Sequence, residues 1–164
     1  MTAPETDSRW LSDTEMATWL ELMSMLVRLP AALDTQLRRD AGITHFEYTV
    51  LATLSEAEGA EMAMSELAFL AEGSLSRLSH CVKRLEAAGW VRRSPHPTNG
   101  RVTLAALTDE GRTKVEATAP GHVAAVRHHV FTPLTSRQVD ELRRIAHRIS
   151  ATIPPEIAPT PTLS

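Results

Sequence analysis

The chain has 164 residues, of which 43% are hydrophobic, a formal net charge of −3 and one cysteine. This composition excludes a disordered or fibrous protein, and the length is enough for one domain with a hydrophobic core. A single cysteine excludes an intramolecular disulfide framework. The N-terminus lacks a basic start followed by an apolar run, and no stretch approaches the roughly 18 apolar residues of a membrane span, which predicts a soluble cytoplasmic protein.

The first expected element is a long helix that follows a polar lead-in over residues 1–12. Ser12 or Asp13 can cap it, Pro30 predicts a kink, and apolar residues follow a near-heptad spacing. They are Met16, Trp19, Met23, Leu26, Leu33 and Leu37, with Leu20, Val27 and Leu29 beside them. This stripe is wider than one neighbouring helix covers, so part of it is expected to face a second subunit. Packing within the chain's own domain is the alternative.

A second helix is expected after Gly42, because Thr44 and Glu47 have the spacing of a capping box. Its inward residues are expected to be Phe46, Val50, Leu51 and Leu54. The sequence AEGAE at 57–61 breaks the pattern, and a short helix is predicted over 64–71. Its expected apolar side consists of Leu67, Ala68 and Leu70.

Gly73 predicts a tight turn and Ser74 an N-cap, so the short helix and the next one form a helix-turn-helix. The next helix has Leu75, Leu78, Val82 and Leu85 on one face. At 100° per residue, the opposite face presents Ser76, His80, Lys83 and Ala87, with Arg77 and Arg84 to one side. The outer face of this helix is therefore small, polar and basic.

Charge is distributed unevenly along the chain. Residues 1–73 carry four Arg against thirteen acids, net −9, whereas residues 74–101 carry six Lys and Arg against Glu86 alone, net +5. The local field decides what docks at a surface, so an acidic total does not exclude nucleic acid. An ordinary solvated helix face is the alternative.

The pattern after Gly89 predicts a two-stranded wing. Trp90 and Val91 begin one strand, SPHPTNG at 94–100 is expected to be a loop, and residues 101–107 return as the second strand. Val102 and Leu104 are expected to lie on one face of the second strand.

The last third is predicted to be helical. Thr108 caps a helix that Pro120 and Gly121 are expected to interrupt. Thr135 and Gln138 then form a capping box for a final helix. The apolar face of that helix consists of Val139, Leu142, Ile145, Ala146 and Ile149. Residues 153–164 are Pro-rich, which predicts a disordered tail.

Three segments, MSELA at 64–68, SRLSHCVKRLEAAGWVRR at 76–93 and NGRVTLAALTDEGR at 99–112, resemble the MarR family of winged helix-turn-helix regulators. The resemblance covers about residues 13–150. It departs from the family pattern in the turn, AEGS, where Gly comes later than is common. It departs also at the wing tip, where Asn99 replaces the Asp that usually precedes Arg101 by two places.

The resemblance implies a mainly α fold with a small β-hairpin wing: a winged helix-turn-helix plus a helical dimerisation region. Dimerisation is expected at 13–43 and 109–152, and DNA binding at 44–108, between a flexible segment 1–12 and the tail 153–164. It also implies a homodimeric, sequence-specific DNA-binding transcriptional regulator rather than an enzyme. Two recognition helices about 34 Å apart would bind double-stranded DNA with an inverted-repeat operator.

The outer face of the second helix of the pair supplies the expected base contacts, Ser76, Arg77, His80 and Lys83. For Arg77, a phosphate contact is the alternative. The expected backbone contacts are Ser74, Arg84, Arg92 and Arg93. Arg101, together with Asn99, resembles the wing of the family, which reaches the minor groove.

The resemblance further implies a repressor released by a small aromatic or phenolic acid. Trp19, Met23, His45 and Tyr48 could line its pocket, with core packing as the alternative for each. No cofactor or metal is expected, and Cys81 is expected to be a small buried hydrophobe.

Two other functions are considered. The first is a metal-responsive regulator that uses His122, His128, His129 and His147, although no paired Asp, Glu or Cys accompanies them. The second is a winged-helix protein-interaction module without DNA binding, which the basic segment 74–101 disfavours.

Overall fold

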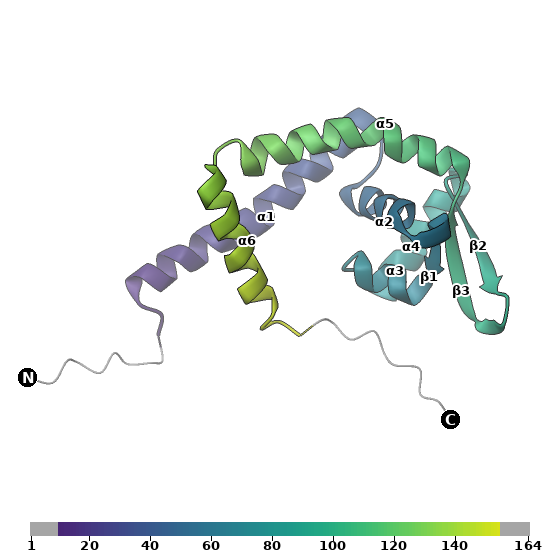
Figure 1. Ribbon diagram of the computed structural model, residues 1–164, viewed down its shortest axis with the longest axis horizontal. Helices are drawn as coiled ribbons and strands as arrows, with labels where there is room; N and C mark the ends of the chain where they lie inside the picture. The colour runs from purple at the N-terminus through teal and green to yellow at the C-terminus, as the bar shows by residue number, and fades with distance from the viewer. Residues whose placement is uncertain (1–9, 155–164) are drawn as a thin grey trace, which may run out of the picture. The chain divides into compact units, whose positions relative to one another are not determined.

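The computed structural model describes residues 10–154, and the structural statements below concern these residues. Two compact units, one extending to Ala32 and the other beginning at Leu33, are described separately. Most of the described chain is helical, with one small antiparallel sheet (Figure 1), so the predicted fold class is confirmed. Most of the expected flexible start, and all but the first two residues of the expected tail, lie outside the described residues.

Helix α1 (Asp13–Ala41) begins where its cap predicts. The Ser12 hydroxyl accepts a hydrogen bond from the Glu15 N–H (3.3 Å), and the Glu15 carboxylate accepts one from the Ser12 N–H (2.8 Å). This reciprocal pair satisfies two donors at the helix start. The helix continues through Pro30 and ends before Gly42, which has the left-handed φ of +68°.

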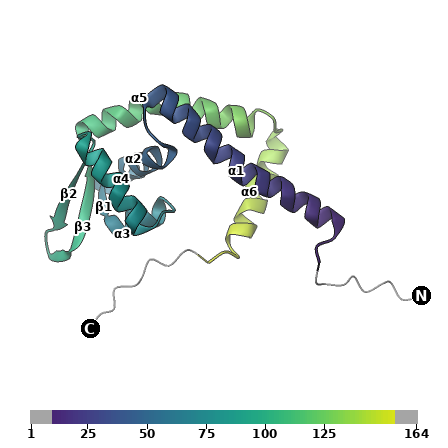
Figure 2. The same ribbon diagram turned by 180° about the vertical axis from the view of Figure 1, so that it is seen from behind.

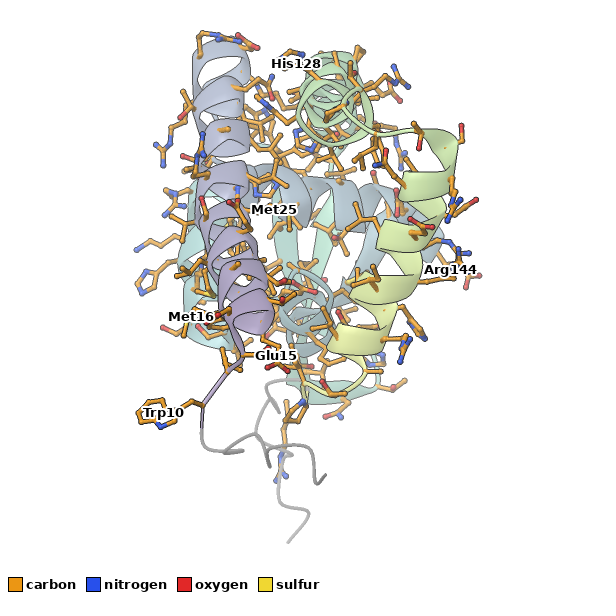
Figure 3. All side chains as sticks on the ribbon, turned by 90° about the vertical axis from the view of Figure 1, so that its left-hand side faces the viewer. Trp10, Glu15, Met16, Met25, His128 and Arg144 are labelled. Carbon is orange, nitrogen blue, oxygen red and sulfur yellow. The ribbon has the colours of Figure 1, made fainter. Side chains whose placement is uncertain are left out.

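The part of α1 in the first unit leaves its apolar side chains exposed. Figure 3 shows Met16 and Met25 among the side chains along this helix, and they are 43% and 45% exposed. Trp19, Leu20, Met23, Leu26 and Val27 are also exposed. The part of the predicted apolar stripe before Leu33 is therefore largely exposed among the described residues, whereas Leu33 and Leu37 of the same stripe are buried within the chain's own core.

By length and composition, α1 could cross a membrane. An 18-residue window within it has a mean hydropathy of 1.2 and contains at most two charged residues. The expectation that no stretch approaches a membrane span is therefore wrong for this helix. The same composition is found in buried helices and in helices that pair with another protein surface, so the criterion alone is weak.

The core of the second unit lies among three short helices and the sheet. Helices α2 (His45–Glu56), α3 (Met64–Leu70) and α4 (Leu75–Ala87) contribute most of it, and the end of α1 contributes Leu37. The fully buried large side chains are Leu37, Val50, Leu51, Leu54, Leu67, Leu78, Cys81, Val82 and Leu85. The predicted inward faces of α2 and α4 are thus largely confirmed. Phe46 is only partly buried, and Leu70 and Leu75 are half exposed.

The turn between α3 and α4 differs from the prediction in the role of its glycine. Two hydrogen bonds, from Glu72 N–H to Phe69 C=O (3.1 Å) and from Gly73 N–H to Ala68 C=O (2.9 Å), close α3 in a Schellman motif. The left-handed position of that motif belongs to Glu72, with φ +51°, and not to Gly73. Gly73 instead allows a close approach of the Phe46 ring, because a Cβ there would lie 2.7 Å from Cζ of Phe46 and the ring would have to shift.

The wing is part of a three-stranded sheet rather than a two-stranded hairpin alone. Strands β2 (Val91–His96) and β3 (Asn99–Leu107) form the hairpin, and β1 (Glu61–Ala63), which follows the short 3₁₀-helix η1 (Glu58–Ala60), pairs with the other side of β3. Pro95, expected in a loop, pairs with Thr103 in the outer strand β2. An edge strand tolerates Pro, because a missing N–H on its open side breaks no ladder bond.

Two long helices follow the wing in the second unit. Thr108 caps α5 (Asp109–Val126) as predicted, but the helix continues through Pro120 and Gly121, so the expected interruption is wrong. A π-helical turn, η2 (Arg127–Phe131), precedes α6 (Ser136–Ser150), whose capping box is present. Ile145 and Ile149 on α6 are exposed. In the views of Figures 1 and 2, α6 turns back from the end of α5.

One side chain of α5 contacts two separate elements of the second unit. Nζ of Lys114 donates to the carbonyl of Ala41 (2.6 Å) and lies 5.0 Å from the centre of the Trp90 ring. The last carbonyls of a helix lack intrahelical donors, and Lys114 supplies a donor to one of these carbonyls. It thereby connects the end of α1 to the start of the wing.

The strained φ of Glu72 predicts a stabilising substitution. Glu72→Gly should raise the free energy of unfolding by about 1 kcal/mol, because a left-handed conformation disfavours a residue with a Cβ. Glu72→Ala keeps the Cβ and should give no such gain. Chemical denaturation of the two variants provides the measurement, and equal stabilities would contradict the assignment of the turn.

Candidate nucleic-acid interface

Helix α4 separates a buried apolar face from an exposed polar one. The Ser74 hydroxyl caps it by accepting from the Arg77 N–H (3.2 Å), so its first turn begins at Leu75 as predicted. The exposed side chains of its outer face are Ser76, Arg77, His80 and Lys83. The structure therefore groups the four predicted base contacts on one accessible surface, defined here as the outer face of α4. Figure 2 shows this helix beside α3.

The first turn of α2 contacts α4 through Glu47. Its carboxylate accepts from the Thr44 N–H (2.7 Å) as half of the capping box and from Nε of Arg84 (2.8 Å). Burial of Glu47 opposes its ionisation, but the hydrogen bonds from Thr44 and Arg84 outweigh burial, so the pKa of Glu47 is lowered. The buried carboxylate of Glu47 orients the side chain of Arg84, which is 59% exposed.

The same turn of α2 contacts α4 a second time. The guanidinium carbon of Arg77 lies 4.0 Å above the centre of the Phe46 ring. This distance and placement describe a cation–π contact. Both arginines that sequence analysis placed beside the outer face of α4 therefore touch the first turn of α2.

Two predicted backbone contacts on β2 are paired with acids. Arg93 binds Glu86 through its guanidinium (2.6 and 2.8 Å) and through its backbone N–H (3.0 Å). Arg92 approaches Glu61 only at 4.0 Å and remains 65% exposed. The net +5 of the basic segment is thus partly offset at Arg84 and Arg93. Among residues 10–154, no ion pair within 4 Å involves Arg77, Lys83 or Arg101.

The wing tip is organised by its own side chains. Oδ1 of Asn99 accepts from the backbone N–H of Arg101 (3.2 Å), and Nδ1 of His96 accepts from the Thr98 N–H (3.2 Å). Asn99 therefore fixes the turn rather than the guanidinium of Arg101, whose residue is exposed.

The four predicted pocket residues are divided between the units. Trp19 and Met23 are on the first unit, and His45 and Tyr48 are on the second. Within the second unit, the ring of His122 from α5 lies 4.5 Å from that of Tyr48 and 5.7 Å from that of His45. Asp34 accepts from the His45 N–H (2.8 Å). Sequence analysis grouped His122 with the other terminal-helix histidines as an alternative metal ligand, and the structure instead places it against two predicted pocket residues.

Among residues 10–154, two buried polar atoms have no hydrogen-bond partner: Nδ1 of His122 in this group and Oε1 of Gln36. Gln36 is 8% exposed, and its Nε2 donates to Asp40 (2.9 Å). Sequence analysis did not identify Gln36, because one Gln on a long helix carries no signal. The adjacency of α1 and α5 that buries it is a tertiary feature.

Comparison with known proteins identifies the group to which this architecture belongs. The model of the MarR family matches residues 43–103. The structure is similar to that of Sco3205, a MarR family transcriptional regulator from Streptomyces coelicolor crystallised in complex with DNA, with 42% identity and a TM-score of 0.87. The match covers 93% of this chain and 96% of that chain.

The chain belongs to the MarR family. AbsC, another MarR family regulator from Streptomyces coelicolor, is 37% identical with a TM-score of 0.79, over 87% of this chain and 99% of that one. Among curated proteins, the regulator PecS of Dickeya dadantii is 31% identical over 105 residues, or 63% of this chain and 62% of PecS. The matches span 54% to 65% of the curated relatives' length.

Members of the MarR family are DNA-binding transcription regulators and not enzymes. The exposed outer face of α4 and the wing are thus parts of a winged helix-turn-helix.

Cys81 is 1% exposed, and burial raises the pKa of its thiol to about 11, which makes it a poor nucleophile. Within the described part of the chain, no three His, Cys, Asp or Glu side chains gather where they could bind a metal ion.

The histidine pair predicts a pH dependence of stability. Burial lowers the pKa of His45 and of His122 from the ordinary value of 6.5. The unfolded chain then binds protons more readily than the folded one. The contribution of these two groups to the free energy of unfolding is therefore complete above pH 6.5, and it is lost as the pH drops through their folded pKa. Denaturation between pH 7.5 and 5 should show this loss, and His122→Gln should make it smaller.

His129→Gln, at an exposed position on η2, is the matched control and should follow the natural protein. If His122→Gln and the natural protein lose stability in parallel, burial of His122 does not carry the pH dependence.

Proposed function

We propose that the protein acts as a homodimer that places one α4 in each of two successive major grooves of an inverted-repeat operator. The observation that carries this proposal is the exposed polar face of α4, whose opposite face is fixed in the core by Leu78, Val82 and Leu85. A helix with one exposed polar face and one buried apolar face can enter a groove without exposing its apolar residues. A relative of 42% identity was crystallised with DNA.

The outer face of α4 would read bases, and the surrounding arginines would contact phosphates. Ser76, Arg77, His80 and Lys83 can present donors to base edges, and Ser76 and His80 can also present acceptors. The proposed backbone contacts are Ser74, Arg84, Arg92 and Arg93. Arg84 and Arg93 bind Glu47 and Glu86, so they would meet phosphates in fixed orientations and with reduced charge. Arg101 would enter a narrow minor groove from the turn that Asn99 stabilises.

The exposed apolar faces of α1 and α6 support dimerisation. Leu20 and Leu26 on α1 are more than half exposed, as is Ile145 on α6, and Trp19 is 48% exposed. Burial of such side chains contributes about 25 cal/mol per Å² of apolar surface. We assign dimerisation to 13–43 and 109–152 and DNA binding to 44–108. A dimer interface also accounts for the apolar composition of α1, in agreement with a cytoplasmic location.

Control by a small ligand completes the proposal. The protein would be a repressor released by an aromatic or phenolic acid, with His45 and Tyr48 of the second unit lining the site. A structural neighbour of 19% identity, BpsR of Bordetella bronchiseptica, has its DNA binding regulated by 6-hydroxynicotinic acid. Such a ligand would act by binding one spacing of the recognition helices better than another, which lowers operator affinity.

A protein-interaction module without DNA binding is the second candidate. The likeness to a DNA-bound relative and the exposed basic residues of α4 favour DNA binding over it. Affinity for random duplex at two salt concentrations separates the two functions, because neutralisation of phosphates gives a steep salt dependence.

The division between base and backbone contacts predicts different effects for two substitutions. Arg77→Ala should lower affinity for a duplex selected from a random pool by about 1 to 3 kcal/mol and relax its specificity. Arg92→Ala should weaken binding to selected and random duplexes alike and reduce the salt slope by about 1. Arg92 is chosen because, among the described residues, its guanidinium approaches a carboxylate only at 4.0 Å, whereas that of Arg93 binds Glu86 at 2.6 Å.

Binding titrations on both duplexes at several salt concentrations provide the measurement. Equal losses on the two duplexes for both variants would show that the assignment of base and backbone contacts is wrong.

A further inference from the structure

The Arg77 side chain does not extend freely from α4. Its guanidinium lies over the ring of Phe46, the second residue of α2, at 4.0 Å from the ring centre. Arg77 is exposed, and no carboxylate within 4 Å fixes it among the described residues. The Phe46 ring is therefore the contact that restricts this arginine before any DNA is present.

The Phe46 ring is itself confined. It packs against the core, and Gly73 lies so close to its edge that a Cβ at that position would approach Cζ and Cε2 to 2.7 and 2.8 Å. Gly73 does not have a left-handed φ, so its lack of a side chain serves this close approach. The turn of the helix-turn-helix thus fixes the surface on which Arg77 lies.

The backbone at Phe46 is fixed as well. The Thr44 hydroxyl accepts from the Glu47 N–H (3.1 Å), and the neighbouring His45 N–H donates to Asp34 (2.8 Å). Glu47 also binds Arg84, seven residues beyond Arg77 on α4. Two successive residues of α2 therefore contact two arginines that lie two helical turns apart on the same side of α4.

We infer that Phe46 is a positioning residue for sequence recognition, which orients the Arg77 guanidinium for a base edge. This inference rests on the proposed function of Arg77. A guanidinium held over the ring on one side keeps the N–H groups that point away from the ring available for a bidentate contact. The contact also restricts the rotamers of the long Arg77 side chain in the free protein, so less side-chain entropy is lost when Arg77 binds DNA. Phe46 touches no DNA in this role.

A double-mutant cycle tests the inference. Phe46→Met retains an apolar side chain of similar length but has no aromatic face for the guanidinium. On the selected duplex it should lower affinity about fivefold, the equivalent of a moderate cation–π contact, while affinity for random duplex changes less than twofold. In the Arg77→Ala background, Phe46→Met should have no further effect on either duplex.

Val115→Ala is the matched control, since Val115 on α5 also packs partly buried against the core. It should reduce stability without changing the ratio of selected to random affinity. A second measurement needs no DNA: the Arg77 Nε–H signal in the NMR spectrum of the free protein should shift when Phe46→Met removes the ring current.

The outcomes are distinguishable. Equal losses for Phe46→Met in both backgrounds, or on both duplexes, would overturn the inference and leave the role of Arg77 intact. An unchanged Arg77 signal in Phe46→Met would overturn it also. If Arg77→Ala itself leaves selected and random affinities unchanged, the proposed base contact fails and the inference fails with it.

Discussion

The position of the helix-turn-helix depends on the carboxylate of Glu47. One oxygen closes the capping box at the start of α2, and the other binds Arg84 on α4. A buried carboxylate requires partners for both oxygens, and here the two partners belong to different elements. The axis and rotation of α4 relative to α2 are thereby fixed at a charged contact, while the leucines between the helices supply the less directional hydrophobic stabilisation.

The same first turn of α2 lies between two regions that the proposal assigns to different tasks. On one side, Phe46 and Glu47 contact Arg77 and Arg84 of α4. On the other, His45 and Tyr48 approach His122 of α5, where Nδ1 of His122 has no hydrogen-bond partner in the structure. A change of charge or packing at His45 would therefore be felt one residue away, at Phe46. The positive charge of Arg77 already contributes to the lowered pKa of His45.

Local signals in the sequence predicted the helix ends. The boxes at Thr44 and Thr135, the caps at Ser74 and Thr108 and the stop at Gly89 are confirmed, because each depends on residues a few positions apart. Strand β1 was not predicted, since three residues show no alternation and its pairing with β3 spans about forty residues of chain. Pro120 suggested a break that did not occur. The role of Gly73 and the unpaired atom of Gln36 depend on distant neighbours, which spacing does not reveal.

For the site, the sequence predicted which residues of α4 face outward but not what constrains them. Periodicity placed Ser76, His80 and Lys83 on the outward face with Arg77 to one side, and all four are exposed. It could not show that Arg77 lies on Phe46, Arg84 on Glu47 and Arg93 on Glu86, because these contacts join residues from 7 to 37 positions apart. The net charge of the basic segment therefore overestimated the charge available to phosphates.

The central claim is that two copies of α4 read two half-sites on one face of DNA, and the spacing of the half-sites tests it most directly. The affinity of the full-length protein should be measured for a selected inverted repeat and for the same repeat with five base pairs inserted at its centre. Half a helical turn moves one half-site to the opposite face of the duplex, so affinity should fall at least tenfold, toward that for random DNA. Unchanged affinity after the insertion would contradict the dimeric arrangement of the recognition helices.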